Sequence, residues 1–98
     1  MSRASLHPQA ARDLADAAEF YRRSASARVA ARFLNEFERV VGLLASNPGF
    51  GTPFDLPRRT YPLRGFPYSV VYRPTENGVR VLVVRHQHRA PGHGQGRS

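Results

Sequence analysis

Apolar residues recur at spacings of three and four in the first half of the chain, which predicts two amphipathic helices. Pro8 suits the first helical position, where no N–H donor is needed. The apolar face of the first helix comprises Ala11, Leu14, Ala18 and Tyr21. The apolar stripe of the second comprises Val29, Phe33, Phe37, Val40 and Leu44, opposite Arg28, Arg32, Asn35 and Arg39. The break at 24–26 offers a serine cap for the second helix, so the pair predicts a helical hairpin.

After Asn47-Pro48-Gly49, which ends the second helix, the pattern changes. Residues 49–57 are rich in proline and glycine and predict a loop. Beyond it the period is two, most clearly where Phe66, Tyr68, Val70 and Tyr72 alternate with other residues. Asn77-Gly78 is a hairpin-turn signal, and a valine-rich strand follows over 79–85. Because Pro62 and Pro67 cannot donate ladder hydrogen bonds, the first of these strands should lie at an edge or at a bend.

The order of elements predicts an α+β fold. A short N-terminal strand over 3–7 precedes the helical hairpin, and a three-stranded antiparallel meander follows it. A helical pair that covers one face of such a sheet is one of the stable two-layer arrangements. We expect a single domain over residues 1–91 and a flexible tail over 92–98, because the end of the chain carries glycines and no large apolar residue.

Length and composition narrow the function classes. The chain has 98 residues and no cysteine, which excludes disulfides, thiolate metal sites and cysteine nucleophiles. No apolar run approaches the roughly 20 residues of a membrane helix, and residues 1–9 lack the apolar core of a signal peptide. We therefore expect a cytoplasmic protein.

Charge indicates a macromolecular partner. The formal net charge is +8, and the chain contains 15 arginines and no lysine. Arginine binds phosphates and carboxylates with two parallel hydrogen bonds and stacks on bases. The expected partners are polyanions: nucleic acid, the ribosome or an acidic protein.

Histidines and arginines near the C-terminus are the candidates for chemistry. Histidine can act as a general acid or base near neutral pH and arginine can hold a phosphate, which points to Arg85, His86, His88, Arg89 and His93. The alternative is that His86 and His88 end a strand and bind the backbone. Three histidines could also hold a metal, but no carboxylate lies nearby and the local charge is positive, so we expect no metal and no cofactor.

Two further groups have alternative interpretations. Tyr61, Tyr68 and Tyr72 could stack on bases, but aromatic residues on strands more often pack in the core. Arg58, Arg59 and Arg64 lie on the first meander strand and its loops, and could join Arg85 and Arg89 in one basic patch.

Several local motifs occur in a fixed order over about residues 5–91. They are Ala10 to Leu14 with Tyr21, Ala31-Arg32-Phe33 with Leu43, Asn47 to Gly51, Arg59 with Leu63, Phe66 to Arg73, and His88 to Pro91. In this order the sequence resembles the ParE/RelE toxin superfamily of type II toxin–antitoxin systems, and within it the ParE-like branch. The resemblance implies growth arrest by one of two routes: RelE-like members cut messenger RNA on the ribosome, and ParE-like members poison DNA gyrase. It also implies an antitoxin whose acidic C-terminal segment wraps the toxin and whose other half can bind operator DNA.

Departures from the nuclease pattern favour the gyrase route. Thr60, Pro62 and Ser69 stand where RelE-like enzymes carry basic residues, and the C-terminal tyrosine is missing. The sequence thus predicts a gyrase inhibitor that acts by binding; the alternative is a metal-independent endoribonuclease using Arg85, His88, Arg89 and His93. The candidate target-binding residues are Arg58, Arg59, Arg64, Tyr68, Arg85, His86, His88 and Arg89.

Overall fold

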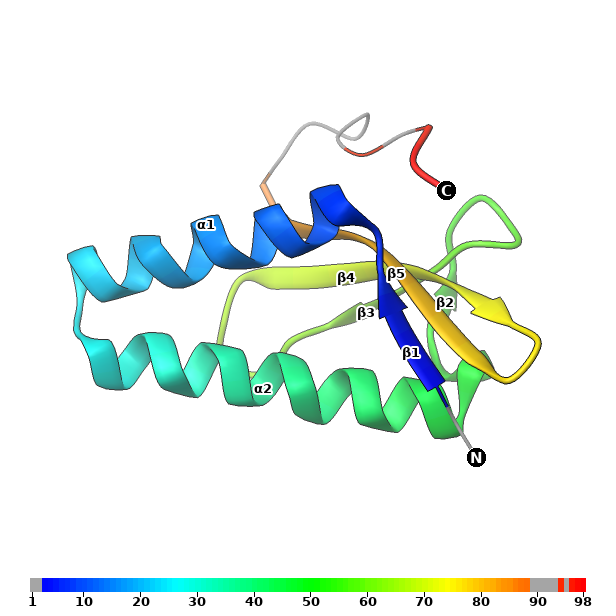
Figure 1. The fold of residues 1–98 in the computed structure, drawn as a ribbon, viewed down its shortest axis with the longest axis horizontal. Coiled ribbons are helices and arrows are strands. Elements are labelled where there is room, and N and C mark those ends of the chain that lie inside the picture. The colour runs from blue at the N-terminus through cyan, green and yellow to red at the C-terminus, as the bar shows by residue number, and fades with distance from the viewer. Residues whose placement is uncertain (1–2, 89–93, 95) are drawn as a thin grey trace.

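A helical hairpin covers one face of a five-stranded mixed sheet (Figure 1). The computed structural model describes residues 3–88, 94 and 96–98. In chain order the elements are β1 (Arg3–Leu6), α1 (Pro8–Ser24), α2 (Ala27–Ser46), the 3₁₀ turn η1 (Pro48–Phe50), β2 (Thr52–Pro53), β3 (Arg59–Pro62), β4 (Tyr68–Thr75) and β5 (Gly78–His86). The predicted α+β class, the short first strand and the helical hairpin are confirmed.

Local capping sets the helix boundaries. Pro8 opens α1, where the His7 ring accepts a hydrogen bond from the Gln9 N–H. The Ser26 hydroxyl accepts from the Val29 N–H at 3.1 Å and so caps α2. At the other end, the Asn47 side chain donates to the Leu43 carbonyl, and proline at 48 stops the helix. Within the described part of the chain, no helix is long and apolar enough to cross a membrane.

The strand order is β1-β5-β4-β3-β2. Neighbours β2 to β5 are antiparallel, whereas β1 runs parallel to β5 over Arg3↔Gly78 to Leu6↔Val81. A parallel pair needs a long crossover, and the helical hairpin is part of it. Gly78 allows the close approach of β1, because a Cβ at this position would overlap the Arg3 carbonyl.

One strand was missed by the sequence pattern. The predicted loop over 49–57 contains the 3₁₀ turn and the two-residue β2, which pairs with β3 through Thr52↔Thr60 and Pro53↔Arg59. As a result β3 is second from the edge. Pro62 is still tolerated because it is the last residue of β3, opposite Ser69. Such a short pairing leaves no period in the sequence.

A β-bulge in β5 creates two apolar faces. The register runs Val71↔Val83 and then Tyr72↔Val81, which leaves Leu82 as an extra residue. Val81 and Val84 therefore pack in the main core with the helices, whereas Leu82 and Val83 pack on the other face with Phe54. This explains why residues 81–84 are continuously apolar instead of alternating.

The described residues of the C-terminal segment lie against β5 and α1. The Arg97 Nη1 donates to the Leu82 carbonyl at 3.2 Å and to the Asp13 carboxylate at 2.6 Å. The Arg80 Nε donates to the Ser98 carbonyl at 3.1 Å. Residues 92, 93 and 95 of the predicted flexible tail lie outside the described residues, so its flexibility stays a prediction. The candidate residues Arg89 and His93 also lie outside them.

Candidate functional site

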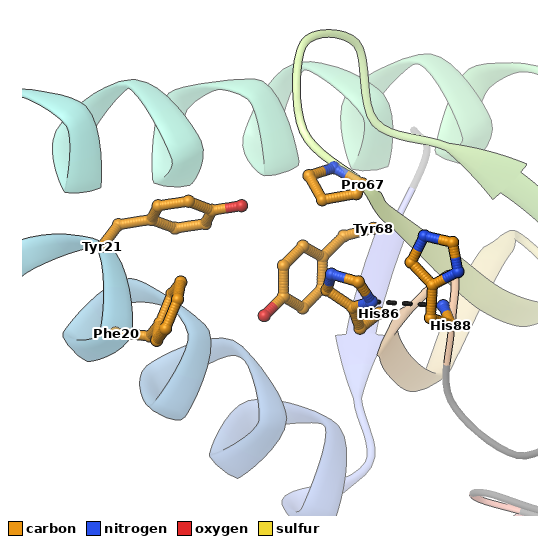
Figure 2. Close-up of a pocket in the computed structure, with 6 residues that line it drawn as sticks. All are labelled: Phe20, Tyr21, Pro67, Tyr68, His86 and His88. Atoms are coloured by element: carbon orange, nitrogen blue, oxygen red, sulfur yellow. Dashed lines mark hydrogen bonds between the residues drawn. The ribbon is translucent and has the colours of Figure 1, made fainter. Parts of the chain in front are cut away.

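An open pocket of about 350 Å³ forms where β4 begins and β5 ends, beside the C-terminal half of α1 (Figure 2). We call it the histidine pocket. Its lining residues are Phe20, Tyr21, Pro67, Tyr68, His86 and His88. Three of the predicted target-binding residues, Tyr68, His86 and His88, thus come together here.

The pairing of β4 with β5 builds the histidine side of the pocket. Tyr68 and His86 are register partners, so they share a face of the sheet and their rings meet edge to face at 5.1 Å. The Gln87 N–H then donates to the Pro67 carbonyl at 2.8 Å and turns the chain. This turn brings the His88 ring to 5.2 Å from that of His86.

A backbone hydrogen bond fixes the tautomer of His86. The His88 N–H donates to the His86 Nδ1 at 3.1 Å (Figure 2). Because Nδ1 is the acceptor, neutral His86 carries its proton on Nε2. We also considered from the sequence that these histidines end a strand and bind the backbone, and this holds in part for His86. Both rings nevertheless line the pocket.

Aromatic side chains from both helices pack against the residues that line the pocket. Tyr21 lies 6.1 Å from Tyr68 and 5.3 Å from Phe33, ring centroid to ring centroid. Burial, and secondarily the neighbouring Tyr68, raises the pKa of the Tyr21 hydroxyl. Phe20 is 55% exposed at the rim. The pocket is thus a rigid aromatic surface with an exposed apolar edge, which suits recognition of a partner.

The histidine pocket continues along α1 into a second hollow of about 360 Å³. Phe20, Tyr68 and His86 line both, and the second adds Asp13, Asp16, Ala17 and Val84. We call the two hollows together the α1–β5 groove. At its far end the Asp13 carboxylate accepts from the Val84 N–H at 3.2 Å and from Arg97. The groove is therefore acidic at one end, aromatic in the middle and imidazole-lined at the other.

The predicted basic patch is not assembled by the described residues. Arg58 forms an ion pair with Asp55, and Arg59 donates to the Gly51 carbonyl at 2.9 Å. Arg64 lies beside α2, where its N–H donates to Glu36. Arg85 lies 5.0 Å from the Phe54 ring centroid, on the face opposite the helices. Strand alternation separates two of them, because Arg59 shares a face with Tyr72 whereas Arg85 faces away from the helices.

The same alternation separates the candidate nuclease residues. Arg85 pairs with Ser69 and faces away from the helices, whereas His86 pairs with Tyr68 and faces the histidine pocket. Within the described part of the chain, the Nη1 atom of Arg85 is buried and has no hydrogen-bond partner. Arg89 and His93 lie outside the described residues.

The sequence pattern does not predict the helical half of the site. Phe20 and Tyr21 complete the pocket, yet only Tyr21 belongs to the predicted apolar face of α1. The available signal was Phe20 itself, a large apolar residue out of phase with that face. Tyr72 is fully buried, and Tyr61 and Tyr68 pack against the main core, so the packing interpretation of the three tyrosines is confirmed.

No group of three histidine, cysteine or carboxylate side chains stands close enough to hold a metal ion within residues 3–88, 94 and 96–98. The arrangement offers hydrogen-bond donors, stacked rings and charge. It can therefore bind a macromolecular surface.

The architecture and the aromatic groove define the class of protein, a small two-layer α+β domain with a surface suited to a macromolecular partner. The particular family is ParE. The chain belongs to it, because a family model described as "ParE toxin of type II toxin-antitoxin system, parDE" matches residues 4–91. The predicted family and branch are thereby confirmed.

A solved structure shares the fold. It is described as "Chromosomal ParDE TA system from P. aeruginosa", is 24% identical and has a TM-score of 0.75. The match covers 88% of this chain and 96% of the other. Comparison with curated proteins gave no match.

Proposed function

We propose that this ParE-family toxin arrests growth by binding DNA gyrase in the cytoplasm, and that a cognate antitoxin neutralises it. The observation that carries the proposal is the family match over residues 4–91 together with a site built for binding. The toxin acts as a protein ligand of its target and catalyses no reaction of its own.

The sheet positions that would carry a nuclease support binding over catalysis. RNA cleavage without metal requires a base, a group that stabilises the charged phosphorane and an acid, all within reach of one phosphate. Thr60 donates its hydroxyl proton to the Val70 carbonyl at 3.0 Å, and Pro62 and Ser69 have no group that titrates near neutrality. Arg85 and His86 are on opposite faces.

The α1–β5 groove supports an antitoxin partner. Its middle is aromatic and partly exposed, which fits the apolar residues of a helix or an extended segment. The solved neighbour is described as a ParDE toxin–antitoxin system, which agrees with such a partner. An acidic C-terminal segment of the antitoxin would find arginines on most sides of this chain, and the antitoxin's other half could bind operator DNA.

Inducible expression in a bacterial host tests the target. DNA and protein synthesis are pulse-labelled at early times, and purified protein is added to a gyrase supercoiling assay. We expect DNA synthesis to fall first and supercoiling to be inhibited. Growth arrest with unaffected supercoiling would reject gyrase as the target, and absence of arrest would indicate a binding module that is no longer toxic.

A second candidate function rests on Arg85. Its guanidinium lies on the sheet face opposite the helices, beside Phe54, and its Nη1 atom has no hydrogen-bond partner among the described residues. A shift of Phe54 that exposed this atom would let it hold a phosphate of messenger RNA. An endoribonuclease would cut message in a translating extract, and Arg85→Ala, His88→Ala or Arg89→Ala would abolish the cleavage. Message that stays intact with the unmodified protein rejects this alternative.

A further inference from the structure

A row of arginines follows the outward side of α2. Arg28, Arg32 and Arg39 are all exposed, and at 100° per residue they fall within roughly 40° of one another around the helix. Arg64, from the turn between β3 and β4, lies beside them across a depression of about 320 Å³. We call these four residues the α2 arginine stripe. It is separate from the α1–β5 groove, with which it shares no lining residue.

One carboxylate faces the stripe, and its oxygens are already engaged. Arg39 donates to both oxygens of Glu36 at 2.8 Å, and the Arg64 N–H donates to Oε2 at 2.6 Å. In the part of the chain that the structure describes, Arg28, Arg32 and Arg64 form no ion pair. Arg28 and Arg32 thus remain without a counter-charge, and Arg64 shares the charge of Glu36 with Arg39.

Arg32 is held in place by the core below it. Its guanidinium lies 6.0 Å from the centroid of the Phe66 ring. Phe66 in turn meets Tyr21 and Phe33 edge to face at 5.2 and 5.3 Å. A guanidinium fixed over a packed ring loses less conformational freedom on binding than a free one.

The length of the stripe suits a chain of phosphates. Arg28 and Arg39 are eleven residues apart, or about 16 Å along the helix axis at 1.5 Å per residue. Along duplex DNA one strand presents a phosphate every 3.4 Å or so, so the stripe spans about five. The N-terminal turn of α2 has no acidic residue, so the positive end of the helix dipole adds to the field near Arg28.

The position of exposed apolar residues indicates whether the stripe binds nucleic acid or an acidic protein. Protein interfaces depend on a few buried aromatic or aliphatic anchors. The exposed large apolar residue of α2 is Leu34, which lies roughly 120° or more around the helix from Arg28, Arg32 and Arg39. We propose that the α2 arginine stripe binds the phosphodiester backbone of nucleic acid.

Fluorescence anisotropy on the purified full chain tests this without gyrase, so it can fail while the proposed target stands. Labelled duplex DNA and single-stranded RNA of equal length are titrated between 50 and 200 mM salt. The slope of log K against log salt is negative, and each lost phosphate contact makes it less steep by about 0.9 for duplex and about 0.7 for single strands. We therefore expect Arg28→Ala/Arg32→Ala to make the duplex slope less steep by about 1.8. The probe that the unmodified protein binds more tightly identifies the kind of nucleic acid.

The control is Arg3→Ala/Arg12→Ala, which removes the same charge from two exposed arginines elsewhere. It should leave the slope within about 0.5 of the unmodified protein. Equal losses in both double variants would reduce the effect to net charge and overturn the proposal. Binding to polyglutamate but not to either nucleic acid would overturn it in favour of an acidic protein segment.

Discussion

At the scale of single residues, a few buried polar contacts hold the site's framework. The Tyr72 hydroxyl donates to the Pro48 carbonyl at 2.7 Å and accepts from the Gly51 N–H at 2.8 Å, while burial raises the pKa of this hydroxyl. The sequence predicts that Tyr72 is in the core. It does not predict these partners, since they lie 21 and 24 residues away.

Tyr72→Phe should destabilise the fold by about 1–3 kcal/mol, because it leaves a buried N–H and a carbonyl without a partner. Urea unfolding measures the loss. The matched control is Tyr61→Phe, a partly buried strand tyrosine for which we expect a smaller change. Equal effects would show that the Tyr72 hydrogen bonds add little.

Glu36 should make stability depend on pH in the acid range. Hydrogen bonds from Arg39 lower the pKa of its carboxyl from the ordinary 4.5, with smaller help from the Arg64 N–H and opposed by burial. A lowered folded-state pKa means that this stabilisation is complete above the unfolded value and is lost as the pH falls through the folded one. Thermal unfolding from pH 6 to 3 should therefore show a loss of stability below about 4.5 that Glu36→Gln lacks.

Glu38→Gln is the control for that measurement, since Glu38 is an exposed carboxylate on the same helix. It should follow the unmodified protein across the range. A profile for Glu36→Gln that matches the unmodified protein would contradict the expected contribution of Glu36.

At the scale of elements, hydrophobic periodicity predicted the long and regular helices and strands. Both helices and the β4–β5 hairpin are where the pattern and the Asn77-Gly78 signal place them. The two-residue β2 and the bulge at Leu82 were missed, because each departs from a period for only one or two residues. Short pairings of this kind are decided by tertiary contacts.

The pairing of β1 with β5 depends on one glycine. Gly78→Ala should destabilise the protein and loosen β1, because the added methyl group collides with the Arg3 carbonyl. Relative to the unmodified protein, Gly78→Ala should speed hydrogen exchange of the β1 amides more than that of the amides in the β3–β4 pair. The contrasting variant is Gly42→Ala, where an added Cβ meets nothing within 4 Å and α2 should gain about 0.5–1 kcal/mol. Unchanged exchange in β1 would show that the strand tolerates the collision.

At the scale of the whole molecule, composition indicates a kind of partner but not where it binds. The charge of +8 indicates a polyanion or an acidic protein, but the arginines expected in one patch are spread over two faces and an edge. Strand alternation groups Tyr68 with His86, whereas His88 lies beyond β5 and joins them through the turn at Gln87. Phe20 could not be grouped with them, since its place depends on how α1 crosses the sheet.

The contact of Arg97 with Asp13 determines where the protein is best tagged or immobilised. Asp13 lines the α1–β5 groove, so Arg97 lies at the acidic end of that groove, whereas Arg3 pairs with Gly78 at the far end of β5. An affinity tag or a sensor-chip linkage fused after residue 98 would crowd the groove. Attachment before residue 3 leaves it accessible, so binding kinetics are better recorded from that end.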